Sequence, residues 1–258
     1  LASSAALEVA TAKLMEKASG KTLAPWVRIR AAQLAEQECA GVPCGMMDQF
    51  IVAQGQKGKA ILLDCQTEET TPVPFENSDV ALLVINCGVS HVLGESSYAE
   101  RRQQCEAAAM VLSVSSLRAA SEADLLNLKK DELLLRRARH VLSENKRTLK
   151  AAEVLQRGDW NSLGMLFNDS HASLRDDFEV SCQELDLLVD LALSESDVLG
   201  ARMTGGGFGG SIIVLAMRDS VEQIAESITS KYYKVNNLVS VCSLVLAAPG
   251  ADFLELNI

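Results

Sequence analysis

The chain has 258 residues, of which 48% are hydrophobic and 22% charged, so it can build one large globular core or two modest ones. Its formal net charge of −10 disfavours a general binder of nucleic acids or of anionic membranes. No apolar run reaches the roughly 18 residues of a membrane span, and no signal segment opens the chain. The seven cysteines form no C-x-x-C pair, which predicts reduced thiols in an intracellular protein.

Two helices are predicted in the first forty residues. Ser3 and Ser4 are good N-cap residues, and an apolar pattern of helical spacing follows them until Gly20. Hydroxyls at the positive end of a helix can hold phosphate or its cation, but we expect ordinary capping because it is commoner. Pro25 opens the second helix, and Glu36 lies on its apolar side, where a carboxylate needs a metal, a cation or water at the core edge.

The segment 41–50 brackets Asp48 with tight-turn residues on one side and apolar residues on the other. A carboxylate in such a place is poorly hydrated. It acts as a general base if it faces a pocket, and it caps a helix if it does not. The segment alone leaves both roles open.

Short apolar runs at Ala60–Cys65 and Val80–Ile85 predict two buried strands. The Thr/Pro/Glu-rich turn region Glu68–Pro74 lies between them and predicts a domain boundary. We therefore divide the chain into residues 1–72 and residues 73–258.

Helices are predicted from about Tyr98 onward. A long helix at Leu133–Gln156 has one apolar face, and its opposite, basic face is expected to be solvated. Asp176 and Asp177 are adjacent, so their side chains diverge and form a structural ion cluster with Arg175 rather than an acid/base pair. The apolar face comprises Ala138, Val141, Leu142, Leu149, Ala152 and Leu155, and the basic face comprises Arg136, Arg139, Lys146, Arg147 and Lys150.

A capping box formed by Ser181 and Glu184 is predicted to begin the next helix, whose apolar residues are Leu185, Leu188 and Ala192. This helix is expected to end before a glycine-rich segment.

That segment, Met203–Ser211, contains five glycines in nine residues. It satisfies the G-x-G-x-x-G spacing of dinucleotide-binding folds, but such a motif must open a helix, and here a strand at Ile212–Met217 follows. A glycine-rich turn without a ligand remains an alternative. A helix with the apolar residues Val221, Ile224, Ile228 and Tyr232, followed by a strand over 239–246, then completes a β-α-β tail. The second half therefore predicts a sheet covered by helices.

Several catalytic classes lack support. His91, His140 and His171 share no metal-ligand spacing, and the chain has neither a G-x-S-x-G nucleophile elbow nor a Walker motif.

Taken together, the motifs resemble those of the GHMP family of small-molecule kinases, and within it the galactokinase group. The opening LASSAALEVA is similar to the back half of the family's second motif, and Met203–Ser211 is similar to its third. Gly41–Phe50 resembles the galactokinase segment G-x-P-C-G-x-M-D-Q-F. Similar stretches begin at Tyr98, Arg136 and Ser173 and follow in the family's order.

This resemblance implies an α+β, two-domain GHMP kinase architecture with ATP and Mg²⁺ as cofactors. It implies cytoplasmic phosphorylation of galactose at its anomeric hydroxyl by a monomer that binds no nucleic acid and no membrane. The implied roles are as follows: Asp48 is catalytic, Gly45, Asp48 and Tyr98 bind sugar, Ser3, Ser4, Gly205, Gly206, Gly207 and Gly209 bind ATP, and Ser4 and Glu36 hold Mg²⁺.

Two alternatives stay open. One is an N-acetylgalactosamine kinase of the same family, and the other is a non-catalytic galactose and ATP sensor. The chain starts at Leu1 inside a motif, has no counterpart of the family's first motif, and has Ala2 where a further serine is usual. We therefore expect it to be the larger, C-terminal portion of a longer protein, with a truncated N-terminal domain and no activity by itself.

Overall fold

A computed structural model describes residues 1–42, 44–77, 79–90 and 94–253. The chain forms two compact units, one made of Leu1–Glu76 with Leu246–Ile258 and the other of Asn77–Val245. These units are defined by the contacts between residues. They do not test the predicted division into two family domains after residue 72, which stays a prediction.

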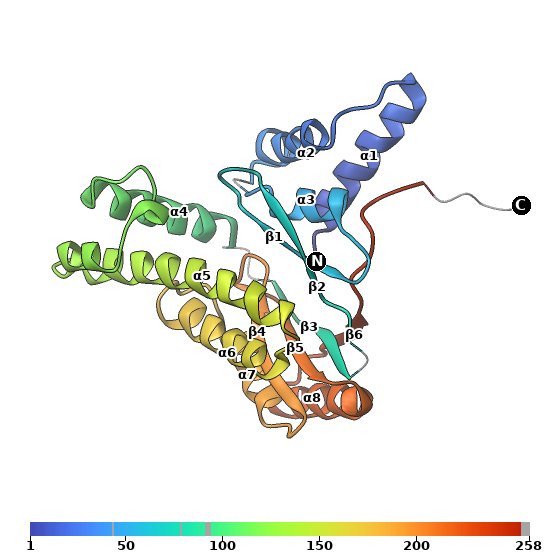
Figure 1. Ribbon diagram of the computed structural model, residues 1–258. Coiled ribbons are helices and arrows are strands. Elements are labelled where there is room, and N and C mark those ends of the chain that lie inside the picture. Colours follow the sequence, from blue (N-terminus) through green and yellow to red (C-terminus); the bar gives the residue numbers. More distant parts are fainter. Residues whose placement is uncertain (43, 78, 91–93, 254–258) are drawn as a thin grey trace, which may run out of the picture. The chain divides into compact units, whose positions relative to one another are not determined.

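Three helices pack against one another in the first unit (Figure 1): α1 (Ser3–Ser19), α2 (Pro25–Cys39) and α3 (Met47–Gln54). The predicted end of α1 at Gly20 and the predicted start of α2 at Pro25 are confirmed. The prediction that a serine caps α1 is wrong. Its N-cap is Ala2, in a left-handed conformation, and no side chain accepts a hydrogen bond from the first turn.

The predicted turn region before residue 75 contains a strand. β1 (Lys59–Leu63) pairs antiparallel with β2 (Thr70–Pro74) in a two-stranded sheet. Prolines at 72 and 74 are tolerated there because an edge strand pairs along one side only. The strand expected at 60–65 is confirmed, but it is only half-buried because β2 is its single partner strand.

The end of the chain returns to the first unit. The Gly250 N–H donates to the Gly55 carbonyl at 2.8 Å, and the Ala251 N–H donates to the Val52 carbonyl at 2.7 Å. Lys13 Nζ on α1 donates to the Ala251 carbonyl at 2.6 Å. These bonds hold the tail against α1 and the last turn of α3.

A four-stranded antiparallel sheet organises the second unit. Its strands are β3 (Val80–Ser90), β4 (Val198–Thr204), β5 (Gly209–Met217) and β6 (Val241–Val245), in the order β4-β5-β3-β6. α7 (Gln183–Leu193) and α8 (Val221–Asn236) pack against this sheet around one apolar core. The predicted β-α-β tail is confirmed as β5, α8 and β6. The predicted apolar residues of α7 and α8 are buried: Leu185, Leu188, Ala192, Val221, Ile224, Ile228 and Tyr232.

β4 is a strand that the sequence pattern did not reveal, because glycine interrupts it. A Cβ on Gly200 would lie 2.2 Å from the carbonyl oxygen of Gly164 in α6 (Trp160–Asp176), so the two backbones touch. β4 is an edge strand, and α6 supplies a partner for its outward N–H groups: Ala201 donates to Asn168 Oδ1 at 2.9 Å. The glycine pair thus lets α6 cover the edge of the sheet.

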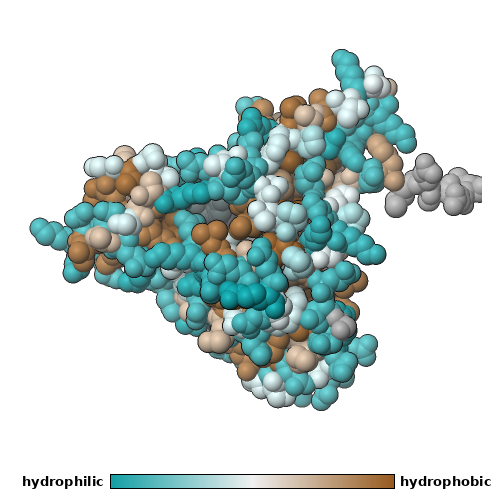
Figure 2. Space-filling view, in the orientation of Figure 1, coloured by the Kyte–Doolittle hydropathy of each residue, from teal (hydrophilic) through white to brown (hydrophobic). Residues whose placement is uncertain are grey.

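A second apolar core lies between α4 (Gly94–Val111) and α5 (Glu132–Gln156), which run side by side in Figure 1. Short 3₁₀ helices at Leu117–Ala119 and Ala123–Leu128 connect them, and another at Arg218–Ser220 precedes α8. Figure 2 shows hydrophobic residues over the α4–α5 part of the surface. Met110 and Val111 at the end of α4, and Leu126 in the second 3₁₀ helix, are exposed.

The faces of α5 differ partly from the prediction. Arg137 is only 1% exposed, and its guanidinium is satisfied by Gln104 Oε1 at 2.7 Å and Glu179 Oε2 at 2.6 Å. Leu149, which was predicted to lie on the apolar face of the helix, is 58% exposed. Basic residues of the other face form ion pairs, such as Arg136 with Glu179 at 2.8 Å. Paired charges thus replace part of the expected apolar contact.

The connection from α6 to α7 is held by polar contacts. The predicted structural ion cluster is confirmed for Arg175, whose Nε lies 2.8 Å from Asp176 Oδ1, whereas Asp177 pairs instead with Arg139 on α5. The predicted capping box is wrong. Ser181 donates to Asp186 Oδ1 at 2.5 Å, and the N-cap of α7 is Cys182 rather than Ser181, with no side-chain cap hydrogen bond.

These features confirm an α+β fold with a helix-covered C-terminal sheet. All seven cysteines are free thiols, as predicted. None of the helices over the described ranges is both long and apolar enough to cross a membrane. His91 lies outside the described residues.

Candidate active site

The beginning of α1 is the first predicted element of the site. Ser3 and Ser4 lie exposed in its first turn, and their hydroxyls cap nothing. The first backbone bond at this end runs from Ala6 N–H to the Ala2 carbonyl, so the N–H groups of residues 3–5 donate to no described residue. Free N–H groups and the positive end of the helix dipole together favour an anion.

Three acidic side chains approach one another in the first unit. Glu8 on α1 is hydrogen-bonded to Glu36 on α2, which is 9% exposed. Gln49 Nε2 on α3 donates to Glu8 Oε2 at 3.2 Å. Asp48, next to Gln49, is close enough to Glu36 for its charge to act on the Asp48 carboxyl. The helices α1, α2 and α3 therefore each contribute an acidic side chain to one cluster, namely Glu8, Glu36 and Asp48.

This environment changes the proton affinity of two carboxyls. Desolvation and then the negative charge of Glu36 raise the pKa of Asp48 above its ordinary value. Desolvation and the hydrogen bond to Glu36 raise the pKa of Glu8 in the same direction. Asp48 is still exposed to solvent at the start of α3, so it combines raised basicity with access. That combination suits a general base.

The loop before α3 brings Gly45 near Asp48 in the chain. Gly45 is exposed, and a Cβ built on it would have no heavy atom within 4 Å. Open space beside a backbone leaves room for a ligand to approach it closely. Pro43, in the same motif, lies outside the described residues.

The glycine loop between β4 and β5 belongs to the second unit. Gly205, Gly207 and Gly209 have φ angles of 84°, 88° and 121°, which side chains rarely adopt. A Cβ on Gly207 would lie 2.2 Å from the carbonyl oxygen of Val180, whereas Gly205 and Gly206 have open space around them. The loop is therefore a hairpin connection fixed at one glycine and open at the two before it.

Backbone donors of this loop are available. Phe208 N–H donates to the Val180 carbonyl at 2.8 Å, but the N–H groups of residues 205–207 donate to no described residue. Successive free N–H groups near left-handed residues can bind an anion. The strand β5 follows the loop, as predicted, and β4 precedes it, which the sequence pattern did not reveal.

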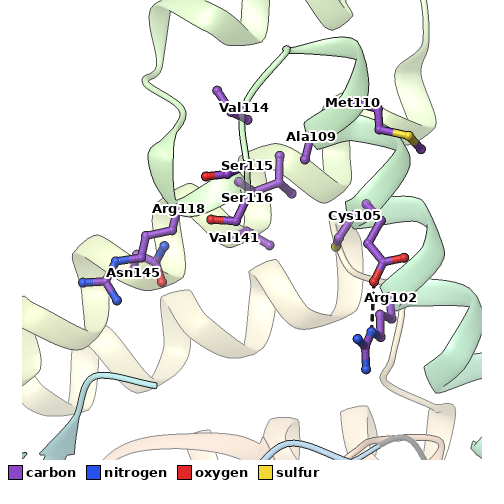
Figure 3. Close-up of a pocket in the computed structure, with 12 residues that line it drawn as sticks. Arg102, Cys105, Ala109, Met110, Val114, Ser115, Ser116, Arg118, Val141 and Asn145 are labelled. Carbon is purple, nitrogen blue, oxygen red and sulfur yellow. Dashed lines mark hydrogen bonds and ion pairs between the residues drawn. The ribbon is translucent and has the colours of Figure 1, made fainter. Parts of the chain in front are cut away.

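Tyr98 lies near the start of α4 in the second unit and is 36% exposed. A groove of about 620 Å³ opens farther along α4, toward α5 (Figure 3), where Cys105, Ala109 and Val141 contribute to its lining. No predicted site residue lines this groove.

Of the predicted site residues, Glu36 and Asp48 thus lie in one acidic cluster in the first unit. Tyr98 and the glycine loop lie in the second compact unit. Glu8 and Gln49 were missed from the sequence. Glu8 carried a signal, because it lies four residues after Ser4 and thus on the same face of α1.

A Mg²⁺ ion fits the residues present, provided that the ligand brings oxygens of its own. Among the described residues, no group of three or more His, Cys, Asp or Glu side chains could hold a metal. Mg²⁺ is commonly bound by one or two carboxylates together with phosphates and waters rather than by a full protein cage. Ser4 lies one turn before Glu8, whose carboxyl meets Glu36, so the donor types suit such a shared site.

Comparisons with known proteins match two parts of the chain to one family. The family model described as GHMP kinases N terminal domain matches residues 1–56, and the model described as GHMP kinases C terminal matches residues 151–234.

Similar full-length proteins are galactokinases. The chain is 45% identical over 238 residues to the galactokinase of Bos taurus and 45% identical over 237 residues to that of Homo sapiens, covering 90% of this chain and 60% of each relative. It is 44% identical over 232 residues to the galactokinase of Thermotoga neapolitana, covering 66% of that protein. The chain therefore spans about three fifths of the length of its mammalian relatives.

A solved structure extends this similarity to the whole described fold. The galactokinase of Lactococcus lactis complexed with galactose matches with a TM-score of 0.93 and 34% identity, covering 98% of this chain and 67% of that one. The mevalonate kinase of L. major, at 20% identity and a TM-score of 0.64, shares the fold.

Proposed function

Because this chain belongs to the GHMP kinase family, we propose that the protein containing it transfers the γ-phosphoryl group of ATP to the anomeric hydroxyl of galactose. The products are galactose 1-phosphate and ADP. The similarity to galactokinases supports this choice of sugar.

Asp48 carries the proposal. Its carboxyl is exposed at the start of α3, while desolvation and the charge of Glu36 raise its pKa. Asp48 orients the sugar hydroxyl and accepts its proton as the phosphoryl group is transferred. A positioned base of this kind contributes about 10²- to 10⁴-fold to the rate.

Backbone donors hold the nucleotide in this proposal. Phosphoryl transfer depends mainly on alignment and charge neutralisation, so free N–H groups directed at phosphate oxygens provide most of the stabilisation of the transition state. The first turn of α1, with Ser3 and Ser4, supplies one set of donors. The glycine loop supplies another through the free N–H groups of Gly205, Gly206 and Gly207, and Gly209 follows them as a further ATP contact in the proposal.

Ser4 and Glu36 would hold Mg²⁺, which neutralises phosphate charge when bound. Gly45 and Tyr98 bind the sugar together with Asp48. The Gly45 backbone is open to a ligand, and the exposed Tyr98 offers a phenolic hydroxyl as donor or acceptor.

We also propose that the protein acts as a cytoplasmic monomer whose family domains meet near residue 72. The seven free thiols support a reducing compartment, and the family matches at 1–56 and 151–234 support two domains on either side of that residue.

The test measures ADP release by the natural protein that contains this chain, with galactose, with N-acetylgalactosamine and without sugar. We expect rapid release with galactose only. Preference for the acetamido sugar would favour an N-acetylgalactosamine kinase, and ligand binding without release would favour a sensor. The 258-residue chain is assayed in parallel, because its lack of turnover is itself a prediction from the sequence.

A further inference from the structure

Two glutamine side chains on α2 converge on one backbone carbonyl. Gln37 Nε2 donates to the Cys44 carbonyl oxygen at 2.8 Å, and Gln33 Nε2 donates to the same oxygen at 3.3 Å. The two glutamines are four residues apart, so they project from one face of the helix. A carbonyl oxygen has two lone pairs and can accept both bonds.

The carbonyl that they hold shares a peptide plane with the Gly45 N–H. Because that plane is rigid, fixing the direction of the Cys44 carbonyl also fixes the direction of the Gly45 N–H. The other side of Cys44 is held as well, since its own N–H donates to the Val42 carbonyl at 2.7 Å. The Gly45 N–H donates to no described residue, and the space beside Gly45 is open.

We infer that Gln33 and Gln37 are positioning residues for the sugar, which aim the Gly45 N–H at one galactose hydroxyl. This inference rests on the proposed function. The two accepted bonds also polarise the Cys44–Gly45 peptide and strengthen its N–H as a donor. A donor that is aimed before binding spares the ligand the cost of ordering the loop.

Methionine substitutions test the two hydrogen bonds to the Cys44 carbonyl, because methionine is close in length to glutamine but donates no hydrogen bond. In the natural protein that contains this chain, Gln37→Met should raise the KM for galactose about three- to tenfold, and the double variant with Gln33→Met about thirtyfold. The KM for ATP should stay within about twofold, since the nucleotide donors lie elsewhere. Gln56→Met is the matched control, because this exposed glutamine of the same unit makes no side-chain bond to a described residue.

Deoxygalactoses distinguish an aimed donor from general loosening of the loop. The series lacking the 2-, 3-, 4- or 6-hydroxyl is assayed with the wild type and the double variant. For the sugar that lacks the hydroxyl contacted by Gly45, the penalty of the double variant should disappear, while it persists for the other sugars.

Three results would overturn the inference without touching the proposed function: equal rises in the KM values for galactose and ATP, the same penalty with every deoxy sugar, or an unchanged galactose KM in an active double variant. Absence of galactose turnover by the wild type would contradict the proposed function and the positioning role with it.

Discussion

Replacing Gly207 by alanine tests whether the glycine loop is built around a backbone contact. The structure offers a graded series within three consecutive glycines. Gly206 has an ordinary φ and open space, Gly205 has a φ of 84° and open space, and Gly207 has a φ of 88° and a carbonyl 2.2 Å from the position of a Cβ. Alanine should therefore add no strain at position 206, backbone strain alone at 205, and both backbone strain and steric overlap at 207.

The expected losses of unfolding free energy follow from these differences. Gly206→Ala should stay within about 0.5 kcal/mol of the wild type. Gly205→Ala should cost about 1 kcal/mol, because a left-handed conformation disfavours a Cβ by about 1–2 kcal/mol. Gly207→Ala adds an overlap with Val180, and overpacking costs about 1–3 kcal/mol, so its total should be about 3 kcal/mol.

Urea unfolding followed by tryptophan fluorescence measures these values. The chain has two tryptophans, Trp26 in the first unit and Trp160 in the second. A Trp26→Phe background leaves Trp160 as the only reporter, so the transition belongs to the unit that contains the loop. Equal stability of the Gly206→Ala and Gly207→Ala variants would refute the backbone contact as the reason for glycine at 207.

Three further predictions concern the base, a buried histidine and the chain end. Asp48→Asn should lower kcat about 10²- to 10⁴-fold with little change in ATP affinity. In the wild type, kcat/KM should fall at low pH as Asp48 is protonated, with a midpoint above the ordinary aspartate pKa because the pKa of Asp48 is raised. The Asp48→Asn variant should lack this fall. Burial lowers the pKa of His140 to about 4 in the folded chain. Between pH 6.5 and pH 4 the His140 imidazole is therefore protonated in the unfolded chain but not in the folded one. Unfolding free energy should fall by about 3 kcal/mol across that window, and a His140→Asn variant should lack this loss in pH-dependent urea titrations. Gly250→Ala should destabilise the first unit by about 2 kcal/mol, because its Cβ would lie 2.6 Å from the Ala53 carbonyl, and Trp26 fluorescence in a Trp160→Phe background measures this.

Elements with regular apolar spacing were predictable from the sequence. α8 is the clearest case, since Val221, Ile224, Ile228 and Tyr232 recur at helical spacing and all four are buried. Gly20 ends α1 as expected, because only glycine enters the left-handed conformation there at no steric cost.

Elements that depend on distant partners were not predictable. β4 contains Gly200, whose role becomes clear only beside Gly164 of α6. β2 contains two prolines and pairs only with β1, so its strand character depends on that neighbour. The burial of Arg137 likewise requires Glu179, which lies 42 residues away in the chain.

The candidate site shows the same division. Asp48 could be singled out because local sequence alone suggested a poorly hydrated carboxylate. Glu8 and Gln49 join Asp48 and Glu36 only when three helices pack together, so they could not be paired from spacing. The family resemblance supplied the expected roles, and the structure supplied the neighbours that raise the pKa of Asp48.

The most direct test of the central proposal is nuclear magnetic resonance of the sugar product formed by the natural protein with ATP, Mg²⁺ and galactose. We predict phosphate on the anomeric oxygen, appearing at the same rate as ADP, with the rate about 10²- to 10⁴-fold lower in the Asp48→Asn variant. ADP formation without a phosphorylated sugar, or an undiminished rate in that variant, would contradict the proposal.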